Sequence, residues 1–359
     1  MRKISIIILF LLNFHVFAQD RESLYQDAYK QLTEMLEGKR PISFKKAVFL
    51  VENAYLSGNL DTIRMNTQIH SLKNLALKIK ENRKLKYFEK DYEKVSIYAS
   101  LFSVMKDSIP MINQNGERFI HIPFTYDFND VFGHQNWKNM FVSKLLDTQK
   151  GNCHSLPYLY KILAEELGVG KDTHLALAPN HFYIKHHSLK NGWYNTELTS
   201  GIFPMDAWLM ASGFIHLTAI QNGVFMKALT EKESIALCLV DLAQGYQKSQ
   251  FYDIDFVIKC ANKAIEYYPN FVNARILKTE AKGKKIKDIL YTYNTNFSDV
   301  LKYEKTKKIF YEIQNELTQI HDLGYRQMPE DMYLEWLVSL KKEKEKYSNK
   351  KINTFTKQN

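Results

Sequence analysis

The chain has 359 residues, of which 45% are hydrophobic and 25% charged, and its formal net charge is +10 at pH 7. This length can bury a sizeable core in one to three domains, and the composition is that of an ordinary globular protein. A basic chain can bind nucleic acid. Here the lysines are interleaved with glutamates and no aromatic–basic recognition motif is present, so we expect no nucleic-acid partner.

The N-terminal segment has the pattern of a secretory signal peptide. Arg2 and Lys3 precede an apolar run over residues 4–17, and Ala18 follows it as a small residue. We expect cleavage before Gln19. The run is shorter than the about 20 residues that span a bilayer, and no later segment is long and apolar enough. The sequence therefore predicts an exported protein, periplasmic or secreted, without a membrane span once the signal peptide, residues 1–18, is removed.

Residues 19–107 have apolar side chains at helical spacing, which predicts an N-terminal helical region. The second helix of this region is expected to begin after Pro41, with Ser43 as its N-cap residue. We interpret these helices as packing elements rather than as a ligand site.

Residues 108–225 have a mixed pattern that predicts an α+β core. Pro110 and Pro123 bracket a short alternating run over residues 119–122. Further on, helices are expected over residues 137–148 and 153–167, and strands over 173–178, 182–186 and 193–198. The sequence Lys190-Asn191-Gly192 is typical of a hairpin turn between the last two strands. A helix followed by an antiparallel sheet is therefore expected here.

Residues 226–340 predict a C-terminal helical region. Helices are expected around residues 234–247, 254–268, 272–282 and 298–320, and from residue 330 onward. Gly245, Ala264 and Pro269 have a spacing that resembles the tetratricopeptide repeat over about one and a half units, and stable arrays usually need about three. We expect these helices to pack on neighbouring helices. The lysine-rich segment 341–359 is expected to be disordered.

The chain has three cysteines, which cannot all pair with one another. Cys238 and Cys260 lie in apolar helical runs, which favours buried small side chains, and a disulfide between two adjacent helices is the alternative. Cys153 is then the odd cysteine. A free thiol in an oxidising compartment indicates a functional role.

Cys153, His181 and Glu197 occur in the order of a cysteine acyl-transfer site. A thiol is an effective nucleophile only as a thiolate, and the base that activates it needs an orienting partner. The predicted hairpin can place His181 beside either Asn195 or Glu197, because alternate residues of a strand share a face. The alternation alone does not choose between these two partners.

The position of Cys153 at the start of a predicted helix has a chemical consequence. Unpaired amides and the helix dipole lower the pKa of a thiol there, and the same amides can stabilise an oxyanion. Gly151 allows the backbone to come close to a substrate carbonyl. Gln149 and Asn152 are candidates for a second oxyanion donor.

Neighbouring residues add candidates for substrate binding but none for a cofactor. His154 and Trp193 are candidate substrate-binding residues, and both are equally compatible with packing. The histidines at positions 174, 181, 186 and 187 lack the helical spacing of four residues and a Cys-x-x-Cys companion. We therefore expect no metal ion, and no cofactor is indicated.

Three motifs resemble a known family. They are Lys-Gly-Asn-Cys-x-Ser-Leu at residues 150–156, Pro-x-His-Phe at 179–182, and Trp-x-x-x-acidic-x-Thr at 193–199. Together they resemble the transglutaminase-like superfamily of papain-type cysteine proteins, and look most like bacterial members that carry tetratricopeptide-like helices after the core. The resemblance covers about residues 136–201.

The resemblance implies a role for each residue of the site. Cys153 is the implied nucleophile, His181 the general base and acid, and Glu197 the third member. The family usually has Asp at the third position, which keeps Asn195 as an alternative. The implied fold is a papain-like core, in which a helix packs on an antiparallel sheet, with helical regions on both sides of it in the sequence.

Two functions of different classes follow. The first is an exported cysteine peptidase, amidase or acyltransferase that acts on a protein or peptide through a Cys153 thioester. The second is a catalytically inactive binding or scaffold protein, with a protein partner on the tetratricopeptide-like helices. The superfamily also contains members without demonstrated activity, so the motifs alone do not separate the two.

Overall fold

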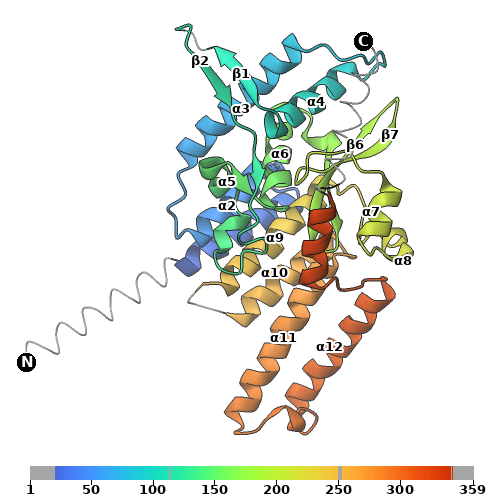
Figure 1. The fold of residues 1–359 in the computed structure, drawn as a ribbon. Coiled ribbons are helices and arrows are strands. Elements are labelled where there is room, and N and C mark those ends of the chain that lie inside the picture. The colour runs from blue at the N-terminus through green and yellow to red at the C-terminus, as the bar shows by residue number, and fades with distance from the viewer. Residues whose placement is uncertain (1–20, 113–114, 250–252, 341, 343–359) are drawn as a thin grey trace, which may run out of the picture. The chain divides into compact units, whose positions relative to one another are not determined.

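The computed structural model describes residues 21–112, 115–249, 253–340 and 342 (Figure 1). The described chain is an α+β protein that is mostly helical and has small sheets, so the predicted fold class is confirmed at this level. The predicted signal peptide, residues 1–18, lies outside the described residues. So does the predicted disordered tail, residues 341–359, apart from Lys342.

Two compact units make up the described chain. The first unit contains the described residues up to 62 together with 231–325, and the second contains 63–230 together with those from 326 onward. This division differs from the segments 19–107, 108–225 and 226–340 predicted from the sequence. An apolar helix face shows that a helix is buried but not which distant helix covers it, so local patterns do not reveal such an assignment.

The first unit is built from helices. They cover residues 21–36, α2 Phe44–Tyr55, α9 Glu231–Gln247, α10 Ile254–Tyr267, α11 Val272–Thr292 and α12 Glu304–Asp322. The ring of Tyr25 packs edge-on against Tyr246 and Phe256, with centroid distances of 4.8 and 6.2 Å. These contacts join the first helix to α9 and α10. The predicted cap of α2 is confirmed, because the side chain of Ser43 accepts a hydrogen bond from the Lys46 amide.

The helices from α9 to α12 pack in succession, each on the next. Gly245 and Ala264 are buried within α9 and α10, and α10 ends just before Pro269. Two predicted boundaries were wrong: α11 continues past Lys282 to Thr292, and α12 begins at Glu304 rather than near Ser298. α11 and α12 lie side by side (Figure 1).

An ion-pair cluster joins α11 to α12. Glu316 of α12 accepts hydrogen bonds from Arg275 at 2.7 Å and Lys278 at 2.6 Å, both on α11. Glu316 is buried, so pairing with two cations is what makes its burial tolerable.

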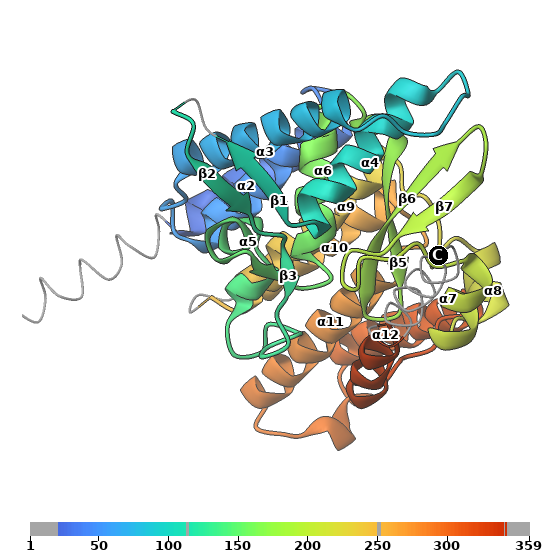
Figure 2. The same ribbon diagram turned by 45° about the horizontal axis from the view of Figure 1, so that its top comes forward.

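The second unit combines helices with short strands (Figure 2). Its helices are α3 Thr62–Asn82, α4 Tyr92–Lys106, α5 Val142–Thr148, α6 Ser155–Glu166, α7 Asp206–Ser212, α8 Leu217–Gln221 and a last helix over residues 330–340. β1 Ile109–Ile112 and β2 Arg118–His121 form one antiparallel pair, and β3 Thr125–Tyr126 and β4 Lys150–Gly151 form a parallel pair. α6 packs against α4, α5 and the sheet that follows it.

The main sheet of this unit has three antiparallel strands in the order β5-β6-β7. They are β5 Thr173–Ala178, β6 His181–Ser188 and β7 Gly192–Thr196. The predicted hairpin turn is confirmed: Gly192 has φ +65°, a value that glycine adopts without a steric penalty. Ile184 pairs with Thr196, and Lys185 with Asn195. This register fixes which side chains meet at the site.

Candidate active site

Asn152 shapes the corner that carries Cys153. Its side-chain oxygen accepts hydrogen bonds from the amides of His154 and Ser155 at 3.0 and 3.1 Å, so it caps the helix α6. The Ser155 hydroxyl accepts in return from the Asn152 amide at 3.1 Å. The side-chain nitrogen of Asn152 donates to the Val131 carbonyl at 3.1 Å. The Asn152 side chain is therefore engaged in holding this corner, and the structure does not direct it at the thiol as an oxyanion donor.

Gly151 is required by packing at the same corner. A Cβ atom at this position would lie 2.5 Å from the Ser155 hydroxyl and 2.8 Å from a methyl carbon of Leu145. The sequence suggested that Gly151 allows the backbone to come close to a substrate carbonyl. In the structure, the absence of a Cβ atom leaves space for the side chains of Ser155 and Leu145.

Gly151→Ala is expected to lower the free energy of unfolding by about 1–3 kcal/mol, because overpacking forces side chains and backbone to shift. Urea unfolding of the purified chain measures this change. Gly283→Ala is the matched control, since a Cβ on that helical glycine meets nothing within 4 Å. The control variant is expected to be neutral or slightly more stable. Equal stability of the two variants would contradict the packing role.

The hairpin β6–β7 places Glu197 against His181. Nε2 of His181 lies 2.5 Å from Oε2 of Glu197, and the other carboxylate oxygen accepts from the Thr199 amide at 2.7 Å. Asn195 instead pairs with Lys185 and donates to Asp206 at 2.7 Å. The sequence left both partners open, and Glu197 is the one that contacts the imidazole.

The Cys153 thiol lies next to this pair. Its sulfur lies 3.6 Å from the carbonyl oxygen of Asn180, the residue directly before His181. The exposed fraction is 7% for Cys153 and 1% for both His181 and Glu197. The structure thus brings together the three residues that the sequence singled out, and it nearly closes them off from solvent.

Hydrogen bonding defines the state of the imidazole. A carboxylate only accepts, so Nε2 of His181 carries a hydrogen that it donates to Glu197. Nδ1 is then the ring nitrogen without a hydrogen, and it lies 2.9 Å from the Tyr333 hydroxyl. A neutral imidazole of this tautomer can accept a proton at Nδ1.

The electrostatics of the pair favour a thiolate and an imidazolium. Burial alone would raise the pKa of Cys153, but the hydrogen bond and charge of His181 outweigh burial and lower it. Burial alone would lower the pKa of His181, yet Glu197 and Cys153 together raise it to about 10. In contrast, burial raises the pKa of Cys260 well above the usual range of a thiol. Two buried cysteines therefore differ in the direction of their pKa shifts.

Two aromatic residues of the 330–340 helix complete the cluster, and no sequence pattern indicated either of them. The Tyr333 hydroxyl lies 2.9 Å from Nδ1 of His181. The Trp336 ring packs edge-on against the imidazole, with a centroid distance of 4.7 Å. Both side chains are buried. Tyr126 of β3 is also buried, and burial raises the pKa of its phenol well above the usual range.

The other predicted site residues lie in different surroundings. Gln149 is partly buried and donates to the Ile122 carbonyl at 3.5 Å. His154 is buried, with Nδ1 2.9 Å from the Met140 carbonyl and its ring against Tyr158. Trp193 lies near the hairpin turn, where its ring contacts His174 and His187. These three side chains therefore contact residues other than His181 and Glu197.

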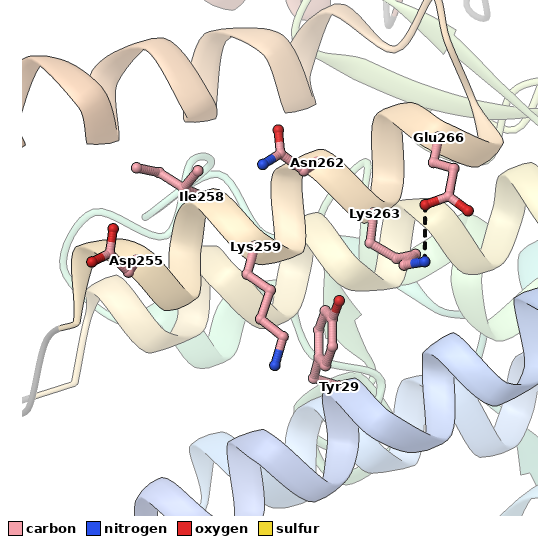
Figure 3. Close-up of a pocket in the computed structure, with 7 residues that line it drawn as sticks. All are labelled: Tyr29, Asp255, Ile258, Lys259, Asn262, Lys263 and Glu266. Atoms are coloured by element: carbon pink, nitrogen blue, oxygen red, sulfur yellow. Dashed lines mark ion pairs between the residues drawn. The ribbon is translucent and has the colours of Figure 1, made fainter. Parts of the chain in front are cut away.

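The first unit has a shallow surface groove along α10 (Figure 3). The ammonium group of Lys259 lies over the Tyr29 ring at 4.2 Å, and Lys263 pairs with Glu266 at 2.9 Å. Both lysines are thus held by neighbours in the groove, and we assign it no function.

The described residues form neither a cluster of metal ligands nor a helix that could span a membrane. Among these residues, no group of three or more His, Cys, Asp or Glu side chains is arranged to hold a metal ion. Within the same part of the chain, no helix combines the length and apolarity that crossing a membrane requires. The three cysteines are unpaired in the structure, so Cys238 and Cys260 do not form the disulfide that was the alternative.

Known proteins of similar sequence or structure do not identify a family for this chain. No family model and no curated protein matches the chain. One similar solved structure is described as "Crystal structure of menin reveals the binding site for Mixed Lineage Leukemia (MLL) protein". It is 12% identical, with a TM-score of 0.32, over 83% of this chain and 74% of that chain. A similarity at this level carries no argument about fold or function.

Proposed function

We propose that this chain is a transglutaminase-like cysteine enzyme that transfers an acyl group from an amide through a thioester on Cys153. The observation that carries the proposal is the buried contact of 2.5 Å between His181 and Glu197, with the Cys153 sulfur 3.6 Å from the carbonyl oxygen of Asn180, the residue before His181. A structural cysteine does not need an oriented base. The papain-like core and the tetratricopeptide-like character of α9 to α12 are parts of the same proposal.

The reaction follows from this arrangement. The thiol proton moves to Nδ1 of His181, and the thiolate attacks the carbonyl carbon of the amide. The carbonyl π electrons move to oxygen, and the Cys153 amide is the candidate donor to this oxyanion, because Asn152 already engages the next two amides. Collapse of the intermediate breaks the C–N bond, and the amine leaves with the proton from Nδ1. A thioester remains on Cys153.

The second half-reaction decides the class of enzyme. Attack on the thioester by water gives a peptidase or amidase, and attack by a lysine amine gives a cross-linking enzyme. His181 accepts the proton of the incoming nucleophile in both cases. We propose export to the periplasm or the medium on the sequence pattern of residues 1–18, and a protein or peptide as the substrate.

One observation favours the alternative function, a catalytically inactive binding or scaffold protein. Cys153 is only 7% exposed, and a substrate carbonyl must come within bonding distance of the sulfur. In the alternative, the same cluster stabilises the second unit and the helices α9 to α12 bind a partner.

Trapping the acyl-enzyme separates the two functions. With an activated ester such as p-nitrophenyl acetate, the chain is expected to form one adduct on Cys153 that hydroxylamine removes, as seen by mass spectrometry. Cys153→Ser is expected to lose this adduct, and Cys260→Ser to keep it. Adding a lysine amine or water as competing acceptors then assigns the second half-reaction. No adduct on Cys153, or equal modification of all three cysteines, would favour the inactive protein.

A further inference from the structure

We infer that Tyr333 is a hydrogen-bonding partner of both the Cys153 sulfur and the His181 imidazole, so that the last helix supplies a working residue of the site. The inference rests on the proposed function, because it assigns Tyr333 to the thiolate–imidazolium pair. The hydroxyl lies 2.9 Å from Nδ1 of His181. Burial raises the pKa of Cys153, and both His181 and Tyr333 lower it.

The packing around Tyr333 holds its hydroxyl in place. The side chain has no exposed surface, and its ring contacts Phe132 and Trp336 with centroid distances of 5.4 and 5.7 Å. The indole nitrogen of Trp336 donates to the Ser212 hydroxyl at 3.0 Å, which fixes this helix at α7. A phenol ring packed on both sides cannot turn away without moving its neighbours.

The segment before the helix is also tied to the site. The side chain of Asn180 donates to the Met328 carbonyl at 2.8 Å, and Asn180 directly precedes His181. The carbonyl of Asn180 lies beside the Cys153 sulfur. The approach of the helix and the position of the imidazole are therefore set by the same short segment.

A hydroxyl fits both protonation states of the pair. With a neutral imidazole, the Tyr333 O–H donates to Nδ1, because the hydrogen of the ring is on Nε2. After the proton moves from the sulfur to Nδ1, the new N–H donates to the phenol oxygen or to the sulfur. The phenol O–H is then free to donate to the thiolate. Burial holds the pKa of Tyr333 well above its usual range, so the phenol keeps its proton.

The buried hydroxyl of Tyr160 has different partners. Tyr160 donates to the Tyr98 carbonyl at 3.1 Å and lies against His186, away from the thiol. Tyr160→Phe therefore removes a buried hydroxyl from the same unit without touching the pair. It is the matched control for Tyr333→Phe, which keeps the ring and its packing.

The experiment titrates the Cys153 thiolate by its ultraviolet absorbance in the full chain, as the difference from the Cys153→Ser variant. This readout does not require a reagent to enter the site. Tyr333→Phe is expected to raise the apparent pKa of Cys153 by about one unit, the effect of losing one hydrogen bond to a charged group. Tyr160→Phe is expected to leave it unchanged. An unchanged or lowered pKa in Tyr333→Phe would overturn the inference.

A second variant tests the same point without removing the hydroxyl. Fluorotyrosine at position 333 keeps the shape of the ring and makes the phenol a stronger donor, so it is expected to lower the pKa of Cys153. A raised or unchanged pKa of Cys153 in the fluorotyrosine variant would overturn the inference. Should Tyr333→Phe fail to fold, this variant still decides the question.

The His181→Ala variant tells the two proposals apart. If it leaves the pKa of Cys153 unchanged, the thiolate–imidazolium pair is absent and the proposed function fails together with the role of Tyr333. If it raises the pKa while Tyr333→Phe does not, only the role of Tyr333 fails.

Discussion

His181→Ala is expected to slow the alkylation of Cys153 by iodoacetamide about 30-fold or more at pH 7. A thiol with the ordinary pKa of about 8.5 is only about 3% ionised at that pH, and burial without a charged partner lowers this fraction further. In the native chain the imidazolium keeps the pKa of Cys153 below its usual range. Mass spectrometry of the labelled peptide over time gives the rate.

A change in the access of iodoacetamide to Cys153 cannot explain slower alkylation in His181→Ala. Alanine is smaller than histidine, so His181→Ala opens the surroundings of the sulfur and would by itself speed the reaction. His154→Ala is the matched control, because His154 is adjacent to Cys153 but bonds the Met140 carbonyl. A much smaller change is expected there. Equal slowing in both variants would mean that the effect is not specific to the base.

Glu197→Gln is expected to reduce the rate of Cys153 acylation by about 10²- to 10⁴-fold, because it changes the tautomer of the base. The glutamine carbonyl can keep the hydrogen bond from the Thr199 amide, which lies at 2.7 Å from the carboxylate. Its NH₂ group then faces Nε2 of His181. The imidazole must respond by carrying its hydrogen on Nδ1, where the thiol proton has to go.

The same substitution is expected to lower the free energy of unfolding by about 1–2 kcal/mol, because a neutral amide forms a weaker hydrogen bond with the buried imidazole than a carboxylate does. Acylation by p-nitrophenyl acetate and urea unfolding measure the two effects. Asn195→Ala is the control, because Asn195 bonds Asp206 and not the imidazole. A loss of acylation in Asn195→Ala equal to that in Glu197→Gln would refute the assignment of Glu197.

The order of Cys153, His181 and Glu197, with the predicted helix and hairpin, predicts that these side chains lie close together. The structure places them near one another. The choice between Asn195 and Glu197 needed the register, because two residues on one strand face are equivalent until pairing is known. The role of Asn152 did have a signal in the sequence, since an asparagine near the start of a helix often accepts hydrogen bonds from the first amides.

The contacts between segments that are far apart in the sequence could not be predicted. Tyr333 and Trp336 are three residues apart on a helix, which is typical of any packing stripe. Their contact with His181 joins segments more than a hundred residues apart. The pairing of Tyr25 with Tyr246 and Phe256 is of the same kind, because it depends on which helices meet and not on the pattern within each.

The order in which the chain builds its second unit has a consequence during synthesis. Cys153, His181 and Glu197 leave the ribosome first, then residues 231–325 of the other unit, and only afterwards Tyr333 and Trp336. Throughout that interval the His181 imidazole lacks its contacts with Tyr333 and Trp336. A nascent chain that has not reached residue 330 therefore holds Cys153, His181 and Glu197 without the helix that packs on the imidazole.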